Sequence, residues 1–158
     1  MEISKIIEKL KTAQMILVGI GESANLQKQQ YLQLEKILEG KNYFIVSLEN
    51  SYGFGETKIK EDRITMPVWN TRDPNWEIYL KWLQGTLNKE LLVLEIGVGF
   101  KYPDVIRFPF EKIVTYNNKA SLVRVNSKIW QLPEELSSKG VGVNSEACEF
   151  LNELSNEF

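Results

Sequence analysis

Two glycine-containing turns are the features of this 158-residue sequence that could hold a ligand. The candidate residues are Gly19, Ile20, Gly21 and Ser23 in the first turn, and Gly97, Val98 and Gly99 in the second. Each turn follows a short apolar run, the pattern of a buried parallel strand. A glycine at such a strand end lets the backbone approach a phosphate, and the following helix turns free amides toward it. We therefore predict a nucleotide-like ligand, although glycine also serves simply to turn the chain.

Two polar residues end other predicted strands. Asn126 closes the apolar run 120–126, and Glu49 follows the run 43–48. In open parallel sheets ligands bind at the carboxyl ends of the strands, so Asn126 would border the same crevice as the glycine turns. Glu49 is a weak catalytic candidate that could contact a ribose or stabilise a ribosyl cation. Its separation from Gly21 exceeds the usual spacing of about 20 residues, and a solvated carboxylate is the simpler interpretation.

The composition excludes several kinds of chemistry. The chain has no histidine and one cysteine, Cys148, so the common zinc sites and every mechanism that needs an imidazole base are excluded. Cys148 lies in a helical pattern, and we expect a buried structural thiol. The net charge is −2 with the basic residues scattered among acidic ones, which argues against nucleic-acid binding. The apolar runs are too short to cross a bilayer, so we expect a cytoplasmic protein.

The hydrophobic pattern predicts alternating strands and helices in one domain over residues 1–158. The predicted strands are 13–18, 43–48, 91–96, 120–126 and 140–143, and the predicted helices are 3–10, 23–38, one after residue 74, 103–106 and 145–154. This order indicates a three-layer, Rossmann-like α/β fold with a mainly parallel sheet. Residues 49–72 are polar and contain a further predicted strand at 63–69, so this segment could form a lid or insertion. We expect Arg107 to pair with Glu111, four residues later.

The motifs around both turns resemble the Sir2 (sirtuin) family. Residues 94–103 read LEIGVGFKYP and residues 122–126 read LVRVN, similar to the turn and the later strand that hold the adenosine of NAD in that family. Residues 19–23 read GIGES and look like its first glycine turn, and residues 103–111 resemble a stretch of some bacterial Sir2-like proteins. The resemblance implies NAD or ADP-ribose as cofactor. Val98 stands in place of a threonine of the family, so only backbone contacts carry over there.

The departures from that family concern its catalytic residues. Where sirtuins have an asparagine and an aspartate followed by a histidine, this chain has Glu49 and Ser51 and no histidine. The zinc-binding cysteines are missing, and residues 25–27 are predicted to run straight into helix in place of the family's substrate loop. With these elements absent, the zinc-binding small domain is absent too, and protein deacetylation is not expected.

Three functional hypotheses follow. The first is a reduced Sir2-like domain that binds NAD, ADP-ribose or a related nucleotide without deacetylation, as a sensor or partner subunit. The second is an NAD glycohydrolase or ADP-ribosyltransferase that uses Glu49. The third is a structural or interaction remnant that binds nothing small. A protein partner or a second copy of the chain stays open as a binding partner.

Overall fold

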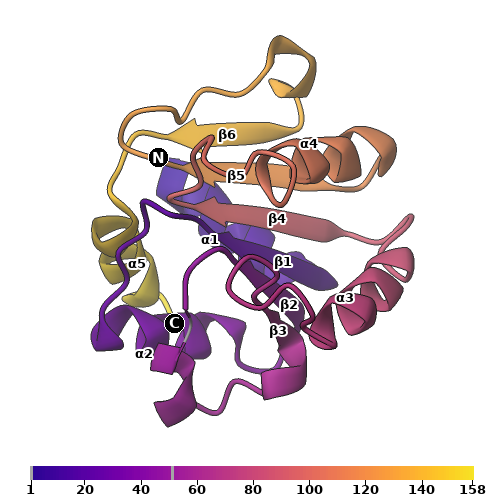
Figure 1. Ribbon diagram of the computed structural model, residues 1–158. Coiled ribbons are helices and arrows are strands. Elements are labelled where there is room, and N and C mark those ends of the chain that lie inside the picture. Colours follow the sequence, from indigo (N-terminus) through magenta and orange to yellow (C-terminus); the bar gives the residue numbers. More distant parts are fainter. Residues whose placement is uncertain (1, 51) are drawn as a thin grey trace.

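The computed structural model describes residues 2–50 and 52–158. Its centre is a six-stranded parallel sheet in the order β3-β2-β1-β4-β5-β6 (Figure 1). The strands are β1 Met15–Ile20, β2 Asn42–Ser47, β3 Ile64–Thr65, β4 Leu91–Ile96, β5 Ser121–Val125 and β6 Gly140–Val143. The helices are α1 Glu2–Thr12, α2 Lys28–Leu38, α3 Asn75–Gln84, α4 Arg107–Tyr116 and α5 Ala147–Ser155. This strand order confirms the predicted Rossmann-like α/β fold.

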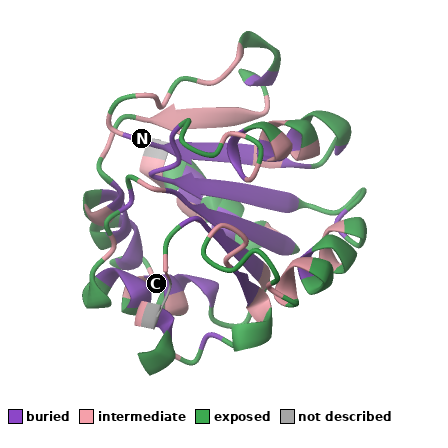
Figure 2. Cartoon of the chain, viewed as in Figure 1, coloured by how far each residue is buried: buried purple, intermediate pink, exposed green. Residues whose placement is uncertain are grey.

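Helices cover both faces of the sheet, which explains why its central strands are mainly apolar. Side chains of α1, α2 and α5 pack with Ile16, Val18 and Ile20 on one face. Side chains of α3 and α4 pack with Leu17 and Val93 on the other. Every residue of β1 and β4 is buried, and Figure 2 shows this buried centre between more exposed helices. Strands buried on both faces need no polar alternation.

Strand β1 begins and ends two residues later than predicted. It continues through Gly19 and Ile20, so both residues belong to the strand and not to the turn, which starts at Gly21. A Cβ atom on Gly19 would lie 2.7 Å from side-chain atoms of both Ile106 and Phe110. This glycine therefore makes room for the packing of α4 and its preceding loop, not for a ligand.

Helix α2 begins at Lys28, five residues later than predicted. Asn25 has a φ of 49°, in the left-handed region that interrupts a right-handed helix. Gln27 then precedes the helix, and its backbone amide donates to the side chain of Gln30 at 3.0 Å. The prediction that residues 25–27 run straight into helix was wrong.

The predicted helix over 103–106 was wrong as well, because those residues form turns and α4 starts at Arg107. Pro109 lies within the first turn of α4, where an amide has no intrahelical acceptor and proline is tolerated. The predicted strand 63–69 is reduced to β3, because the 3-10 turn Glu61–Arg63 precedes it and a turn from Met66 to Asn70 follows. The closing helix α5 begins two residues later than predicted.

The other short elements lie in the connections. They are the 3-10 turns Tyr52–Glu56 and Glu134–Leu136. Among the residues that the structure describes, none of the helices combines the length and the apolar character that a membrane span requires.

Candidate functional site

The two glycine turns lie side by side, because the strands that they follow are neighbours. Ile20 of β1 is paired in register with Ile96 of β4, so both strands end at the same level. The amide of Gly21 donates to the Ile96 carbonyl, and the amide of Ser23 donates to the Gly97 carbonyl, each at 2.9 Å. The turns therefore form one hydrogen-bonded unit at the carboxyl edge of the sheet, the edge at which open parallel sheets bind ligands.

Both turns require glycine for close contact. A Cβ atom on Gly21 would lie 2.3 Å from the Gly97 carbonyl oxygen and from the Val98 Cα. Gly97 has a φ of 64°, and a Cβ atom there would lie 2.5 Å from the Ala24 nitrogen. The neighbouring atoms are backbone and cannot rotate away, so Gly21 and Gly97 first serve the contact between the turns. Sequence alone could not separate this role from phosphate binding.

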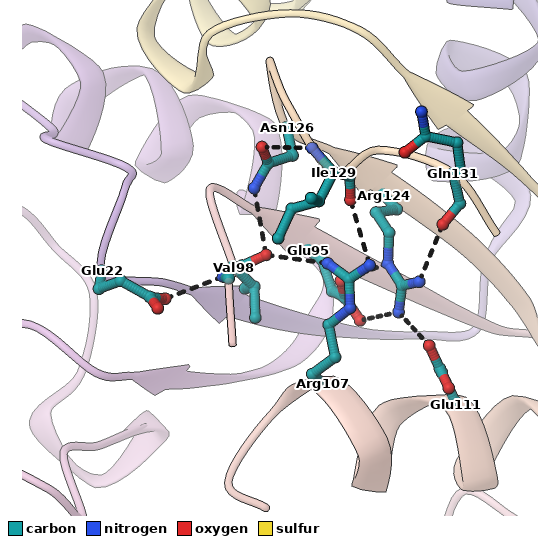
Figure 3. Close-up of polar contacts among 10 residues, drawn as sticks. Glu22, Glu95, Val98, Arg107, Glu111, Arg124, Asn126, Ile129 and Gln131 are labelled. Atoms are coloured by element: carbon teal, nitrogen blue, oxygen red, sulfur yellow. Dashed lines mark hydrogen bonds and ion pairs between the residues drawn. The ribbon is translucent and has the colours of Figure 1, made fainter. Parts of the chain in front are cut away.

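Glu22 links the first turn to the second. Its Oε1 accepts a hydrogen bond from the Gly99 amide at 2.8 Å, and its Oε2 accepts one from the Lys101 amide at 2.9 Å. Partial burial alone would raise the pKa of Glu22. Amide hydrogen bonds, that of Gly99 foremost, and the charge of Lys101 outweigh burial and hold this pKa below its ordinary value. A carboxylate therefore occupies the Gly99 amide of the second turn (Figure 3) and the Lys101 amide that follows this turn.

Asn126 follows β5 and is buried against the second turn. Its Nδ2 donates to the Val98 carbonyl at 3.1 Å, while its Oδ1 accepts from the amides of Lys128 and Ile129. Since β5 pairs with β4, Asn126 borders the same edge as the glycine turns, where the sequence placed it. Every polar atom of its amide group is used to connect the loop after β5 with the loop after β4 (Figure 3).

Arg107 is a buried residue of this region whose environment the sequence did not show. Its guanidinium donates to the carbonyls of Val98 and Ile129, both at 3.1 Å, and lies 4.5 Å from the ring centroid of Phe100. Burial and the nearby Arg124 lower its pKa. Its Nε has no hydrogen-bond partner among the described residues. The expected pairing of Arg107 with Glu111 is wrong.

Glu111 pairs instead with Arg124, which also binds Glu95. Glu95 and Arg124 are register partners on β4 and β5, and their side chains are 0% and 1% exposed. Arg124 donates to both oxygens of Glu95 at 2.8 and 3.1 Å and to Glu111 at 2.8 Å. Burial raises the pKa of Glu95, and Arg124 limits that rise. This ion cluster therefore joins β4, β5 and α4.

Ser23 and Glu49 are both exposed. Glu49 lies two residues beyond the end of β2, which is paired with β1, so it belongs to the same edge as the glycine turns. Ser51, which was predicted to stand in place of the aspartate of the Sir2 family, lies outside the described residues. Cys148 is half-buried and its thiol donates to the Asn25 carbonyl at 3.4 Å, in keeping with a structural role.

A separate cavity of about 750 Å³ lies beside the edge strand β3. Its lining comes from the segment after β2 and from the start of α3, namely Phe54, Gly55, Thr57, Ile59, Glu61, Ile64, Met66, Trp69, Asn70, Asp73 and Asn75. None of the predicted site residues is in this set. Most of its polar side chains are bound internally: Asp73, for example, accepts from the Met66 amide and from the Asn75 amide. The cavity is therefore distinct from the edge that holds the glycine turns.

Comparisons with known proteins found a partial sequence match and a likeness of fold. No family model matches this sequence. A protein ADP-ribosyltransferase from Staphylococcus aureus is 25% identical over 63 residues, which cover 40% of this chain. That match spans only 20% of the Staphylococcus protein. The crystal structure of an exopolyphosphatase-related protein from Bacteroides fragilis superimposes with a TM-score of 0.56 at 10% identity, over 96% of this chain and 42% of that one. At this identity the second likeness is one of fold.

The described residues contain no group of three or more histidine, cysteine, aspartate or glutamate side chains that could hold a metal ion.

Proposed function

We propose that this domain binds the ADP-ribose part of NAD or a related nucleotide at the carboxyl edge of β1, β4 and β5, without sirtuin-type deacetylation. The observation that carries the proposal is that the two glycine turns and Asn126 lie together at the carboxyl ends of β1, β4 and β5. That edge is where doubly wound sheets bind nucleotides. The Sir2-like motifs and the ADP-ribosyltransferase name of the Staphylococcus relative support the same class of ligand.

The proposal assigns different parts of the ligand to the two turns. The first turn, with the exposed Ser23, would lie near the pyrophosphate. The second turn, from Gly97 to Gly99, would lie with Asn126 around the adenosine and the phosphate attached to it. Contacts through backbone amides do not require the side chains that sirtuins use. With no histidine in the chain, there is no imidazole to take the proton from a ribose hydroxyl.

Calorimetric titration with NAD and with ADP-ribose tests this proposal. We expect a saturable heat with ADP-ribose, and a weaker one with AMP, which lacks the second phosphate and ribose. Nicotinamide alone is the control and should give none. Absence of heat and of a thermal shift at millimolar ADP-ribose would overturn the proposal.

A second candidate function is transfer or hydrolysis of the ADP-ribosyl group with Glu49 as the stabilising carboxylate. Two observations favour it: Glu49 is exposed at the edge that holds the glycine turns, and the Staphylococcus relative carries the name ADP-ribosyltransferase. A carboxylate near the ribose can stabilise an oxocarbenium-like cation without a histidine.

Nicotinamide release from NAD separates this candidate from simple binding. If Glu49 takes part, Glu49→Gln abolishes release while ADP-ribose still binds. The matched control is Glu39→Gln, an exposed acid at the end of α2. Equal release by the wild type and by Glu49→Gln would remove Glu49 from the mechanism.

A further inference from the structure

The amides of Gly99 and Lys101 point at one carboxylate. They belong to residues two positions apart, and each donates to a different oxygen of Glu22, at 2.8 and 2.9 Å. Successive backbone amides that converge in this way form a concave binding site for an anion. A phosphoryl group presents oxygens with similar spacing to the same donors. The second turn is therefore a formed oxyanion site that already contains an oxyanion.

Two cationic side chains act on this site, those of Lys101 and Arg107. Lys101 supplies an ammonium group close enough to lower the pKa of Glu22, and the buried Arg107 also interacts electrostatically with Glu22. The other carboxylates near Arg107, those of Glu95 and Glu111, are bound to Arg124. An anion at the amides is consequently favoured whether it comes from the protein or from a ligand.

Glu22 occupies the site by virtue of two local features. Gly99 has no side chain, and a Cβ atom there would lie 2.8 Å from Glu22 Oε2. Glu22 itself lies between β1 and α2, outside any helix or strand, and its side chain is only partly buried. Its carboxylate can therefore leave the amides by side-chain rotation, without loss of secondary structure.

We propose that the amides of Gly99 and Lys101 bind a phosphoryl group of the ligand, and that Glu22 occupies this position in the unliganded protein as a tethered competitor. The phosphate binds by displacing the carboxylate. The apparent affinity for phosphate therefore equals the intrinsic affinity multiplied by the fraction of molecules in which Glu22 has left the amides. The identity of the full ligand rests on the proposed function, but the oxyanion site does not.

The test compares the wild type with Glu22→Ala in titrations with inorganic pyrophosphate, followed by ³¹P NMR and calorimetry. If Glu22 is bound in about nine of ten molecules, its removal raises the affinity for pyrophosphate roughly tenfold. Glu8→Ala removes the same charge from an exposed position on α1 and should leave the affinity unchanged. Unchanged or weaker pyrophosphate binding by Glu22→Ala would overturn the inference.

A second variant covers the event that Glu22→Ala does not fold. Glu22→Gln keeps the shape of the side chain but has one amide oxygen in place of two charged ones. Its affinity for pyrophosphate should fall between those of the wild type and Glu22→Ala. Affinity no higher than that of the wild type would contradict the inference.

Titration of the same variants with ADP-ribose separates the two proposals. If Glu22→Ala gains pyrophosphate affinity and neither protein binds ADP-ribose, the oxyanion site stands and the proposed function fails. If the wild type binds ADP-ribose and Glu22→Ala binds it less well, Glu22 contacts the ligand directly. The proposed function then stands, and the role of tethered competitor is wrong.

Discussion

A Cβ atom on Gly21 would lie 2.3 Å from the carbonyl oxygen of Gly97, although 76 residues separate the two positions. The contact joins two loops that follow neighbouring strands, and it is made between backbone atoms. Neither loop can shift without breaking the hydrogen bonds from Gly21 to Ile96 and from Ser23 to Gly97. The backbone of both turns is thus held in place where a nucleotide is proposed to bind, so that binding requires movement of the Glu22 side chain and not of the turns.

Gly21→Ala should destabilise the protein. The added methyl group meets the Gly97 carbonyl and the Val98 Cα, neither of which can rotate away, so we expect a loss of about 1–3 kcal/mol in the free energy of unfolding. Gly55→Ala is the matched control, because nothing lies within 4 Å of a Cβ atom at that position. Urea unfolding measures both. Equal stability of the two variants would mean that the turns separate more easily than the contact indicates.

The two carboxylates bound to Arg124 should differ in their importance. Glu95→Gln leaves the fully buried guanidinium with only Glu111 as a charged partner, and we expect a loss of about 3 kcal/mol. The Glu111 side chain is 22% exposed, so Glu111→Gln should cost roughly 1 kcal/mol or less. Urea unfolding of both variants at pH 7 tests which substitution costs more stability. A larger loss for Glu111→Gln would show that Glu95 is not the principal partner.

The contribution of Glu22 to stability should depend on pH. Its pKa in the folded protein is lowered by the amides of Gly99 and Lys101 and by the Lys101 charge, against the effect of burial. The stabilisation is therefore fully present above the unfolded pKa of about 4.3 and is lost as the pH falls through the lower folded pKa. Thermal unfolding from pH 7 to pH 3 should show the wild type above Glu22→Gln at neutral pH.

That gap should narrow steadily below about pH 4, as the carboxylate becomes protonated. A gap that stays constant or widens in acid would contradict the assigned hydrogen bonds. Arg107, the other charged group near Glu22, stays protonated throughout this range and cannot cause the change.

The fold was largely predictable because its central strands carry an unambiguous signal. The run from Leu91 to Ile96 is apolar except for Glu95 and matches β4 at both ends. The end of β1 was not predictable, since the missing side chain of Gly19 makes room for Ile106 and Phe110, which are distant in sequence. The start of α4 was obscured by Pro109, which sequence alone cannot assign to a first helical turn or to a loop.

The site was predictable as a location but not as a set of contacts. That Gly21, Gly97 and Asn126 share one edge follows from the order of parallel strands, which the Rossmann pattern implies. The hydrogen bonds of Glu22 to the second turn span 77 and 79 residues, and no local pattern indicates them. Arg107 likewise binds two backbone carbonyls and not Glu111, the acid four residues later that the helical spacing indicated.

The measurement that tests the nucleotide site most directly is a titration of ¹⁵N-labelled protein with ADP-ribose, followed through the glycine amides. We predict saturable changes in the amide chemical shifts of Gly21, Gly97 and Gly99. The amide shifts of Gly40, at the amino end of β2, and of Gly55, in the cavity beside β3, should stay unchanged. Changes confined to Gly55, or no change at any glycine at millimolar ADP-ribose, would contradict the account.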